Sequence, residues 1–65
     1  MFDLRMYGNE IKEIVKFDGI EYRKYEIEEI FQYHAKCRDE FGNVECFSVG
    51  DLITMGALHD KFLRL

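Results

Sequence analysis

The sequence has no proline, no low-complexity run and no long apolar segment in its 65 residues. Hydrophobic residues make up 48% of the chain and aromatic residues 15%, a composition typical of compact globular proteins and not of disordered tails. No apolar run approaches the roughly 20 residues that cross a bilayer, so we expect no membrane partner. The first five residues, MFDLR, lack the basic and apolar regions of a signal peptide, and we therefore expect a cytoplasmic location.

Cysteine is scarce, with Cys37 and Cys46 the two present. A chain this small from an oxidising compartment usually carries a denser disulfide framework, so we interpret both as reduced thiols, with one disulfide between them as the alternative. Together with His34 and His59 they form a His-x2-Cys-x8-Cys-x12-His series, which is not a usual zinc spacing. We predict no metal and no cofactor, and a zinc-stabilised domain is the further alternative.

Catalytic motifs are also missing. The sequence has no Gly-rich phosphate loop, no nucleophile elbow and no paired metal-binding carboxylate motif. Cys37 with His34 is the one local pair that resembles a nucleophile and its base, and such a pair needs a third, orienting group. A chain this short also has little room to enclose a substrate pocket. We therefore predict a single non-enzymatic domain, residues 1–65.

Basic side chains are scarce in the middle of the chain. Residues 1–25 hold five basic and five acidic side chains, residues 26–51 hold two basic and seven acidic, and residues 52–65 hold two basic and one acidic. The net charge of -4 is thus concentrated in residues 26–51, where two minus seven gives -5. Because affinity for nucleic acid depends on neutralising phosphates with Lys and Arg, we predict no direct nucleic-acid binding and a protein partner with a basic surface.

The Asp18-Gly19 pair, between alternating apolar and charged residues, is the strongest hairpin signal in the sequence. A two-residue loop at this pair predicts a register with two apolar and two opposite-charge pairs. The pairs are Phe17 with Ile20, Val15 with Tyr22, Glu13 with Lys24 and Lys16 with Glu21. Such cross-strand pairs stabilise a sheet by about 0.2–1 kcal/mol each.

Residues 2–6 alternate apolar and polar side chains, and Gly8-Asn9 offers a second tight turn. This pattern predicts a third strand before the hairpin. A short helix from Asn9 to Phe17, with Asn9 as its N-cap, is the alternative.

From residue 26 to residue 41 the apolar spacing changes to three and four, which predicts an amphipathic helix ending at Gly42. The residues on its apolar side are Ile27, Ile30, Phe31, His34, Cys37 and Phe41. The alternative is a strand over residues 31–38, joined by a four-residue loop to a strand over residues 44–47. Its register places Cys37 opposite Cys46 and Arg38 opposite Glu45. We favour the helix because the Glu, Gln, Ala and Lys content suits it better.

A second helix is predicted from about residue 49 to residue 61. Ser48 has the spacing of an N-cap, with Asp51 at the N3 position of a capping box. Gly56 weakens this helix by about 1 kcal/mol. The last four residues, 62–65, could instead close a sheet as a short strand. The fold class that follows is α+β, an N-terminal antiparallel hairpin of two or three strands packed against one or two amphipathic helices.

An acidic arc on the expected helix is the strongest functional candidate. The predicted partner-binding residues are Glu28, Glu29, Asp39, Glu40 and Tyr33. A negative surface of this kind docks on a basic groove and competes with phosphate-bearing ligands. The layout of an acidic turn, an amphipathic helix and a closing strand loosely resembles the small uracil-DNA glycosylase inhibitors of bacteriophages, although no diagnostic residue string links the two.

The sequence thus predicts an acidic protein-binding regulator or inhibitor, from a virus or a mobile element, that docks on a basic site of a nucleic-acid-processing protein. The alternative from another class is a structural or homo-oligomerisation module, with a homodimer as its simplest form.

Overall fold

A four-stranded antiparallel sheet forms most of the structure, a computed structural model that describes residues 2–63 and the side chains of residues 2–62. The elements in chain order are the 3-10 helix η1 (Leu4–Glu10), the strands β1 (Ile14–Phe17), β2 (Tyr22–Ile30), β3 (His34–Asp39) and β4 (Val44–Ser48), the helix α1 (Val49–Thr54) and the 3-10 helix η2 (Asp60–Leu63). Each strand pairs with the next, so the sheet order is β1-β2-β3-β4. The α+β prediction is confirmed in this coarse sense, with more strand and less helix than expected.

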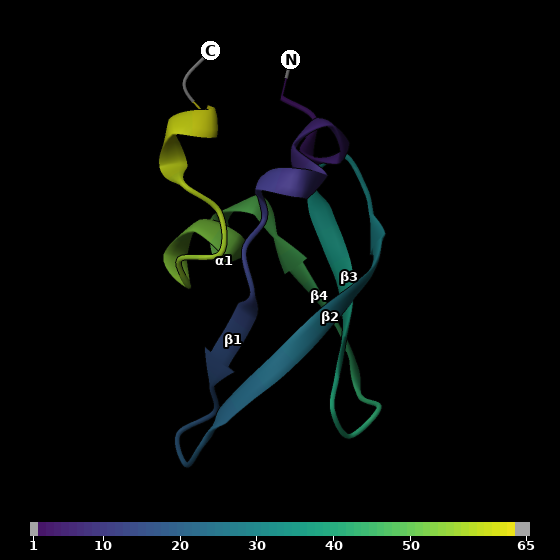
Figure 1. The fold of residues 1–65 in the computed structure, drawn as a ribbon, viewed down its shortest axis with the longest axis vertical. Helices are drawn as coiled ribbons and strands as arrows, with labels where there is room; N and C mark the ends of the chain where they lie inside the picture. Colours follow the sequence, from purple (N-terminus) through teal and green to yellow (C-terminus); the bar gives the residue numbers. More distant parts are fainter. Residues whose placement is uncertain (1, 64–65) are drawn as a thin grey trace.

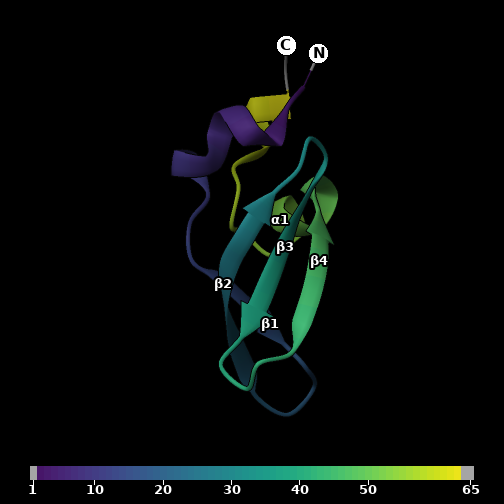
Figure 2. The same ribbon diagram turned by 90° about the vertical axis from the view of Figure 1, so that its right-hand side faces the viewer.

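The sheet curls, so that β1 and α1 lie on the same side of it, as Figure 1 and Figure 2 show. Along the long axis, η1 and η2 lie at one end, and the loops that join β1 to β2 and β3 to β4 lie at the other (Figure 1). The Cα atoms extend over 36 × 20 × 16 Å, so each end is narrow relative to the length. Within residues 2–63 no helix is long and apolar enough to span a membrane.

The core lies on the concave face of the sheet, under α1 and η1. Tyr25 of β2 meets Phe47 of β4 edge-on, with ring centroids 5.0 Å apart. The buried apolar residues are Leu4, Ile14, Tyr25, Ala35, Cys37, Phe47, Val49, Leu52, Ala57 and Leu58. Because side chains alternate between the faces of a strand, the neighbours of these residues on β1 to β4 point to the convex face, which no element covers in the described part of the chain.

The predicted β1–β2 hairpin is present, but its register is two residues away from the predicted one. Phe17 pairs with Tyr22 and Ile14 with Tyr25, because the tight turn is centred on Gly19-Ile20 and not on Asp18-Gly19. Gly19 has φ +100°, the positive value that the first central position of such a turn requires. A shift of two residues leaves the same side chains together on each face, but the face predicted to be buried is wrong, since Phe17 and Tyr22 are exposed and the core takes Ile14 and Tyr25.

The helix predicted for residues 26–41 is wrong. These residues form most of β2, a turn and all of β3. A register shift between Ile27 and Glu29 marks a β-bulge, whose extra residue spaces two partly buried side chains, Ile27 and Ile30, three positions apart. This spacing resembles a helical period. The chain then reverses before His34, and the apolar residues of β3 continue the same spacing in the sequence although they belong to another strand.

The strand alternative for this segment is confirmed in kind but not in register. Cys37 pairs with Glu45 and Arg38 with Val44, one residue away from the predicted pairing. Gly42, with φ +88°, completes a three-residue loop where four residues were expected. A shift of one residue exchanges the faces of a strand, so Cys37 is buried on the concave side while Cys46 is exposed.

The helix after β4 begins as predicted and ends early. Ser48 caps α1 in a complete capping box, in which its hydroxyl accepts from the Asp51 N–H and the Asp51 carboxylate accepts from the Ser48 N–H. Gly56 does more than weaken the helix, because its φ of +80° turns the chain and lets the N–H groups of Ala57 and Leu58 bond to Leu52. The predicted extension to residue 61 is therefore wrong. Residues 62–63 belong to η2, and the rest of the alternative closing strand, residues 64–65, lies outside the described residues.

The third strand predicted at the N-terminus is a 3-10 helix, η1. Its N-cap Asp3 accepts from the Arg5 N–H at 3.0 Å and holds the Arg5 guanidinium at 2.7 Å. Leu4 is fully buried, and its N–H bonds to the Gln32 carbonyl at 2.8 Å. The alternative helix from Asn9 to Phe17 is also wrong, since β1 occupies the second half of that range.

Candidate functional site

Two hairpin loops lie side by side at one end of the molecule (Figure 1 and Figure 2). We call residues 17–22 and 39–44 the hairpin end. In the first loop, the Asp18 carboxylate accepts from the backbone N–H of Ile20 at 2.9 Å and of Glu21 at 2.8 Å. The Asp18 N–H also donates to the Glu21 carbonyl at 3.0 Å. Asp18 therefore holds the backbone of this loop through hydrogen bonds.

The second loop is held in the same way. The Asp39 carboxylate accepts from the backbone N–H of Phe41 at 2.9 Å and of Asn43 at 2.8 Å, and from the Asn43 side-chain amide at 3.2 Å. Arg38 adds a bond from its guanidinium to the Gly42 carbonyl at 2.7 Å. Asp39 is the one buried charged residue in the described chain, and the bonds from Phe41 and Asn43 to its carboxylate compensate its burial.

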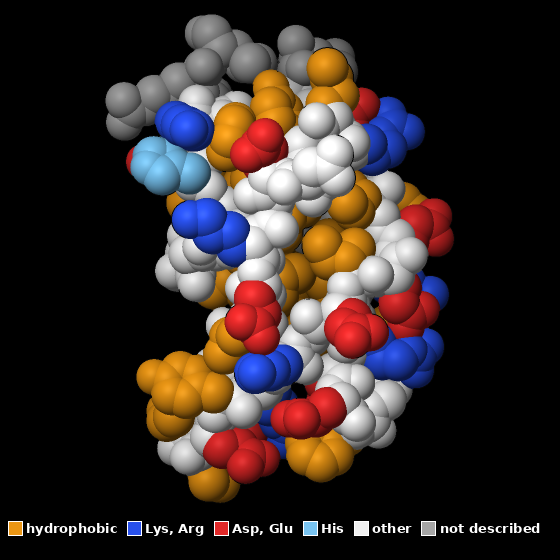
Figure 3. All heavy atoms as spheres, viewed as in Figure 1, with side chains coloured by type: hydrophobic (Ala, Val, Ile, Leu, Met, Phe, Trp, Pro, Cys, Tyr) orange, Lys and Arg blue, Asp and Glu red, His pale blue; other side chains and the backbone are white. Residues whose placement is uncertain are grey.

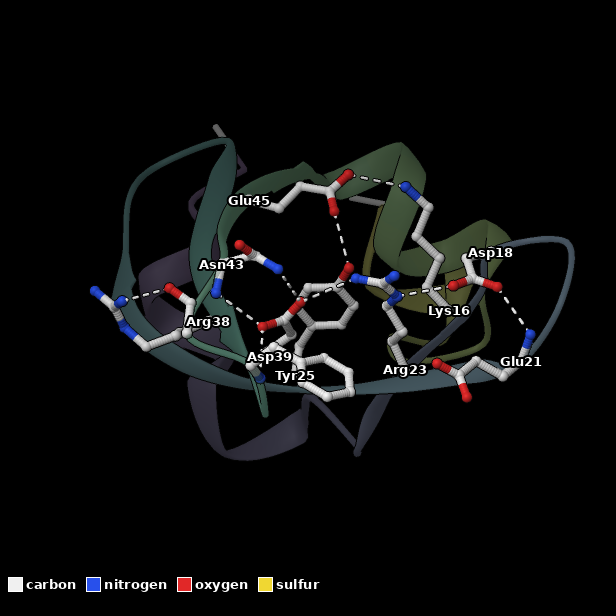
Figure 4. Close-up of polar contacts among 11 residues, drawn as sticks. Lys16, Asp18, Glu21, Arg23, Tyr25, Arg38, Asp39, Asn43 and Glu45 are labelled. Atoms are coloured by element: carbon white, nitrogen blue, oxygen red, sulfur yellow. Dashed lines mark hydrogen bonds and ion pairs between the residues drawn. The ribbon is translucent and has the colours of Figure 1, made fainter.

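Arg23 joins the two loops, as the close-up in Figure 4 shows. Its guanidinium lies 2.8 Å from the Asp18 carboxylate and 3.4 Å from that of Asp39. The same guanidinium lies over the ring of Phe41, 5.6 Å from its centroid. One cation therefore couples the β1–β2 hairpin to the β3–β4 hairpin.

A second ion pair connects the two edges of the curled sheet. Lys16 of β1 donates to Glu45 of β4 at 2.8 Å, and the Tyr25 hydroxyl donates to the other oxygen of Glu45 at 2.9 Å (Figure 4). The Lys16 ammonium also lies over the Phe47 ring, 5.5 Å from its centroid. This group closes the concave side next to the core.

The network keeps its carboxylates ionised. Backbone bonds from Glu21 and Ile20, helped by Arg23, lower the pKa of Asp18 to about 2. Burial alone would raise the pKa of Asp39, but the bonds from Asn43 and Phe41 outweigh it and the pKa is lowered. The bond from Lys16 lowers the pKa of Glu45. Carboxylates with lowered pKa values are poor proton donors near neutral pH, so these groups suit a structural role better than acid–base catalysis.

A hollow of about 370 Å³ opens between the hairpins and is lined by Lys16, Phe17, Asp18, Arg23, Tyr25 and Glu45. The charged groups that line it are bonded to one another. Because a ligand would have to displace these pairs, the hollow is a poor site for a small molecule.

Exposed apolar side chains gather at the hairpin end. Of the seven large apolar side chains that are exposed among the described residues, five lie here and two, Met6 and Tyr33, lie elsewhere. The five are Phe17, Ile20, Tyr22, Phe41 and Val44. Figure 3 shows hydrophobic atoms at this lower end, interspersed with acidic ones. Ile20 is 90% exposed and Phe41 65% exposed.

The five residues predicted to bind a partner are not gathered at one place. Glu28 forms an ion pair with Arg38, and the buried Asp39 forms one with Arg23. Glu29 and Glu40 are exposed, while Tyr33 is 54% exposed in the turn between β2 and β3, at the other end of the molecule. The sequence interpretation missed the anchoring of the loops and their exposed apolar residues. The signal was present, since each loop has an Asp followed two residues later by Ile20 or Phe41.

Most Lys and Arg side chains of the described residues form ion pairs with carboxylates. The pairs are Arg5–Asp3, Lys16–Glu45, Arg23–Asp18, Arg23–Asp39, Lys24–Glu13 and Arg38–Glu28. The predicted contact between Glu13 and Lys24 is among them, at 3.5 Å. Five exposed glutamates have no ion pair with any described residue, namely Glu10, Glu21, Glu26, Glu29 and Glu40.

The alternative zinc set is separated in the fold. Cys37 points into the core, where burial raises the pKa of its thiol to about 11, and Cys46 is exposed on the opposite face of the sheet. His34 begins β3 and stacks on Phe31, and His59 precedes η2. Within residues 2–63, no three His, Cys, Asp or Glu side chains lie close enough together to hold a metal ion.

Comparison of the chain with protein families, curated proteins and solved structures gave no significant match to any of them.

Proposed function

We propose that this chain is a small, non-enzymatic protein-binding regulator or inhibitor that docks an acidic surface on a basic site of a nucleic-acid-processing protein. The observation that carries the proposal is that exposed glutamates of the acidic segment, residues 26–51, have no ion pair with any described residue. They are Glu26, Glu29 and Glu40. A cation supplied by a partner is the natural complement for such groups.

The distribution of ion pairs supports a partner with a basic surface. Of the eight Lys and Arg side chains among the described residues, five are already held by carboxylates. Pairing leaves the net charge of -4 unchanged, and the carboxylates that remain without a partner, such as Glu29 and Glu40, carry negative charge on the surface. A field of one sign accelerates encounter with an oppositely charged site and discourages encounter with nucleic acid itself.

A nucleic-acid-processing protein is proposed because its binding site is made of Lys and Arg side chains that neutralise phosphates. Carboxylates on a small rigid sheet satisfy the same cations. Occupation of that site would exclude the nucleic acid, which is how an inhibitor of this kind acts. A viral or mobile-element origin is part of the same proposal.

The test is affinity capture from the native host with the full chain, followed by titration of the identified protein at several salt concentrations. We expect a partner with a basic site, and we expect Glu29→Lys with Glu40→Lys to lower the association rate about tenfold and to flatten its salt dependence. Glu10→Lys, in η1, is the matched control and should change little. Unchanged binding and salt dependence in the double variant would contradict the proposal.

A homo-oligomerisation module remains the second candidate, because Phe17 and Tyr22 form an exposed aromatic pair, with ring centroids 5.0 Å apart. Sedimentation separates the two candidates. A stable homodimer that binds no captured protein would favour the oligomerisation module.

A further inference from the structure

The two hairpin loops present their exposed apolar residues by one shared device. In each loop an Asp carboxylate bonds the backbone N–H of the residue two positions later, at 2.9 Å in both cases, and that residue is Ile20 in the first loop and Phe41 in the second. The Asp therefore fixes the backbone of the very residue whose side chain it leaves in solvent. In each loop the Asp carboxylate accepts hydrogen bonds that shape the backbone.

The loops are also held relative to each other. Arg23 bridges Asp18 and Asp39, so the positions of Ile20 and Phe41 are coupled through one guanidinium. Binding through loops that are already ordered avoids much of the entropy cost of association. Exposed apolar side chains on such loops have the character of interface anchors, and aromatic residues are frequent among binding hot spots.

We propose that the hairpin end is the docking surface of this protein, with Ile20 and Phe41 as its apolar anchors and Glu21 and Glu40 as its charged rim. The occupant is an apolar depression edged by Lys and Arg side chains on a partner protein. This inference rests on the proposed function and specifies which surface performs it.

The charges beside the anchors identify this occupant and argue against a second copy of the chain. Glu21 follows Ile20 and Glu40 precedes Phe41, and both glutamates are exposed without an ion pair among the described residues. A symmetric contact through this end would bring such glutamates toward each other, which is unfavourable. Lys and Arg side chains around an apolar centre complement both features.

The shape of the molecule sets the form of the partner site. Standard interfaces bury about 800 Å² on each partner, about a sixth of the 4668 Å² surface of this chain. The chain is 36 Å long but 20 × 16 Å across. A flat partner surface would bury too little area on such a narrow end. A concave partner site, or a flexible segment that wraps around the end, would bury enough.

The experiment selects ligands for the full chain from a library of random 16-residue peptides. A peptide of this length spans about 50 Å when extended, enough to wrap around the hairpin end. We expect enriched peptides to combine aromatic or aliphatic residues with an excess of Lys and Arg. Their affinity should fall about tenfold or more in Ile20→Ser and in Phe41→Ser. Met6→Ser, which removes a 77% exposed apolar side chain from η1, is the matched control and should stay within about twofold.

Charge is tested separately. Glu21→Gln with Glu40→Gln should weaken the same peptides and reduce their salt dependence, while Glu10→Gln, in η1 at the opposite end of the molecule, should not. Melting curves check that each variant is folded. Phe41→Ser also removes the contact between Phe41 and Arg23, so Ile20→Ser serves as the test if Phe41→Ser is unfolded.

The outcomes distinguish this inference from the function on which it rests. Basic peptides that bind equally well to Ile20→Ser and Phe41→Ser would overturn the docking surface and leave the proposed function standing. Enriched peptides without an excess of Lys and Arg would count against both. A homodimer in sedimentation that Phe41→Ser dissociates, or pelleting of the chain with phosphatidylcholine vesicles, would assign the surface to another occupant and overturn the inference.

Discussion

The core beneath α1 and the hairpin end reach a defined structure by opposite means. In the core, apolar side chains such as Leu52 and Ile14 are fully or almost fully buried, and packing holds the backbone. At the hairpin end, the carboxylates of Asp18 and Asp39 hold the backbone while Ile20 and Phe41 remain in solvent. The comparison teaches that a small chain can leave apolar side chains free for contact when hydrogen bonds take over the structural role.

The largest effect is expected from a cavity in the core. Leu52→Ala removes a fully buried side chain and should lower the free energy of unfolding by about 2–5 kcal/mol. A single small core contributes a stability of similar size, so the variant should be largely unfolded at 37 °C. Urea denaturation followed by circular dichroism measures the effect. Ile20→Ala is the matched control, and a change beyond about 0.5 kcal/mol there would contradict the division between the two regions.

A smaller but clear effect is expected from loss of a loop anchor. Asp39→Ala leaves the N–H groups of Phe41 and Asn43 without their acceptor and Arg23 without one of its two carboxylates. Its denaturation midpoint should fall below that of Ile20→Ala and stay above that of Leu52→Ala. Amide hydrogen exchange should accelerate in residues 40–43 and remain slow at Cys37 and Phe47. Uniform acceleration across the sheet would show that the anchor supports the core as well.

Acid should lower the stability of the chain in part through the carboxylates of the hairpin end. The pKa of Asp18 is lowered to about 2 and that of Asp39 is also lowered, so ionisation of both carboxylates stabilises the folded chain. For a group whose pKa is lowered by folding, this stability is fully present above the unfolded pKa and is lost as pH falls toward the folded value. Between about pH 4 and pH 2 the denaturation midpoint should therefore fall. Asp18→Asn should flatten this slope, and an unaltered slope would contradict the assigned role of Asp18.

The smallest effect on stability is expected at the exposed thiol. In the native protein, iodoacetamide should modify one thiol per chain, that of Cys46, because Cys37 is buried and burial raises its pKa to about 11. Modification of Cys46 should change the free energy of unfolding by less than about 0.5 kcal/mol. Mass spectrometry identifies the modified residue, and equal labelling of both cysteines would contradict the register of β3 and β4.

The features that sequence reasoning recovered are those set by hydrogen bonds within a few residues. Ser48 and Asp51 form the predicted capping box, and a tight turn occurs close to the predicted Asp18-Gly19 position. Gly42 was expected to end a helix and instead closes a hairpin loop. Its left-handed conformation was predictable, but the element that precedes it was not.

The errors share one cause, which is that apolar spacing does not reveal what covers each face. The bulge near Glu28 and the chain reversal after Ile30 gave residues 26–41 a helical spacing. In the first hairpin, Phe17 and Tyr22 supplied the most apolar pattern, yet the core took Ile14 and Tyr25. The predicted acidic arc depended on the same helix, so its members were separated once the segment became two strands.

The sequence by itself determined some local signals of this protein: a tight turn near Asp18-Gly19, the left-handed Gly42, the start of α1, and the concentration of negative charge in residues 26–51. Each depends on neighbours within about four positions, so the residues concerned are adjacent in any fold. The tertiary structure alone decided which face of each strand is buried and which carboxylates are paired. Those outcomes depend on strands that meet across long separations, as Lys16 and Glu45 do, 29 positions apart. Tertiary contacts of this kind leave Ile20 and Phe41 exposed together at the hairpin end.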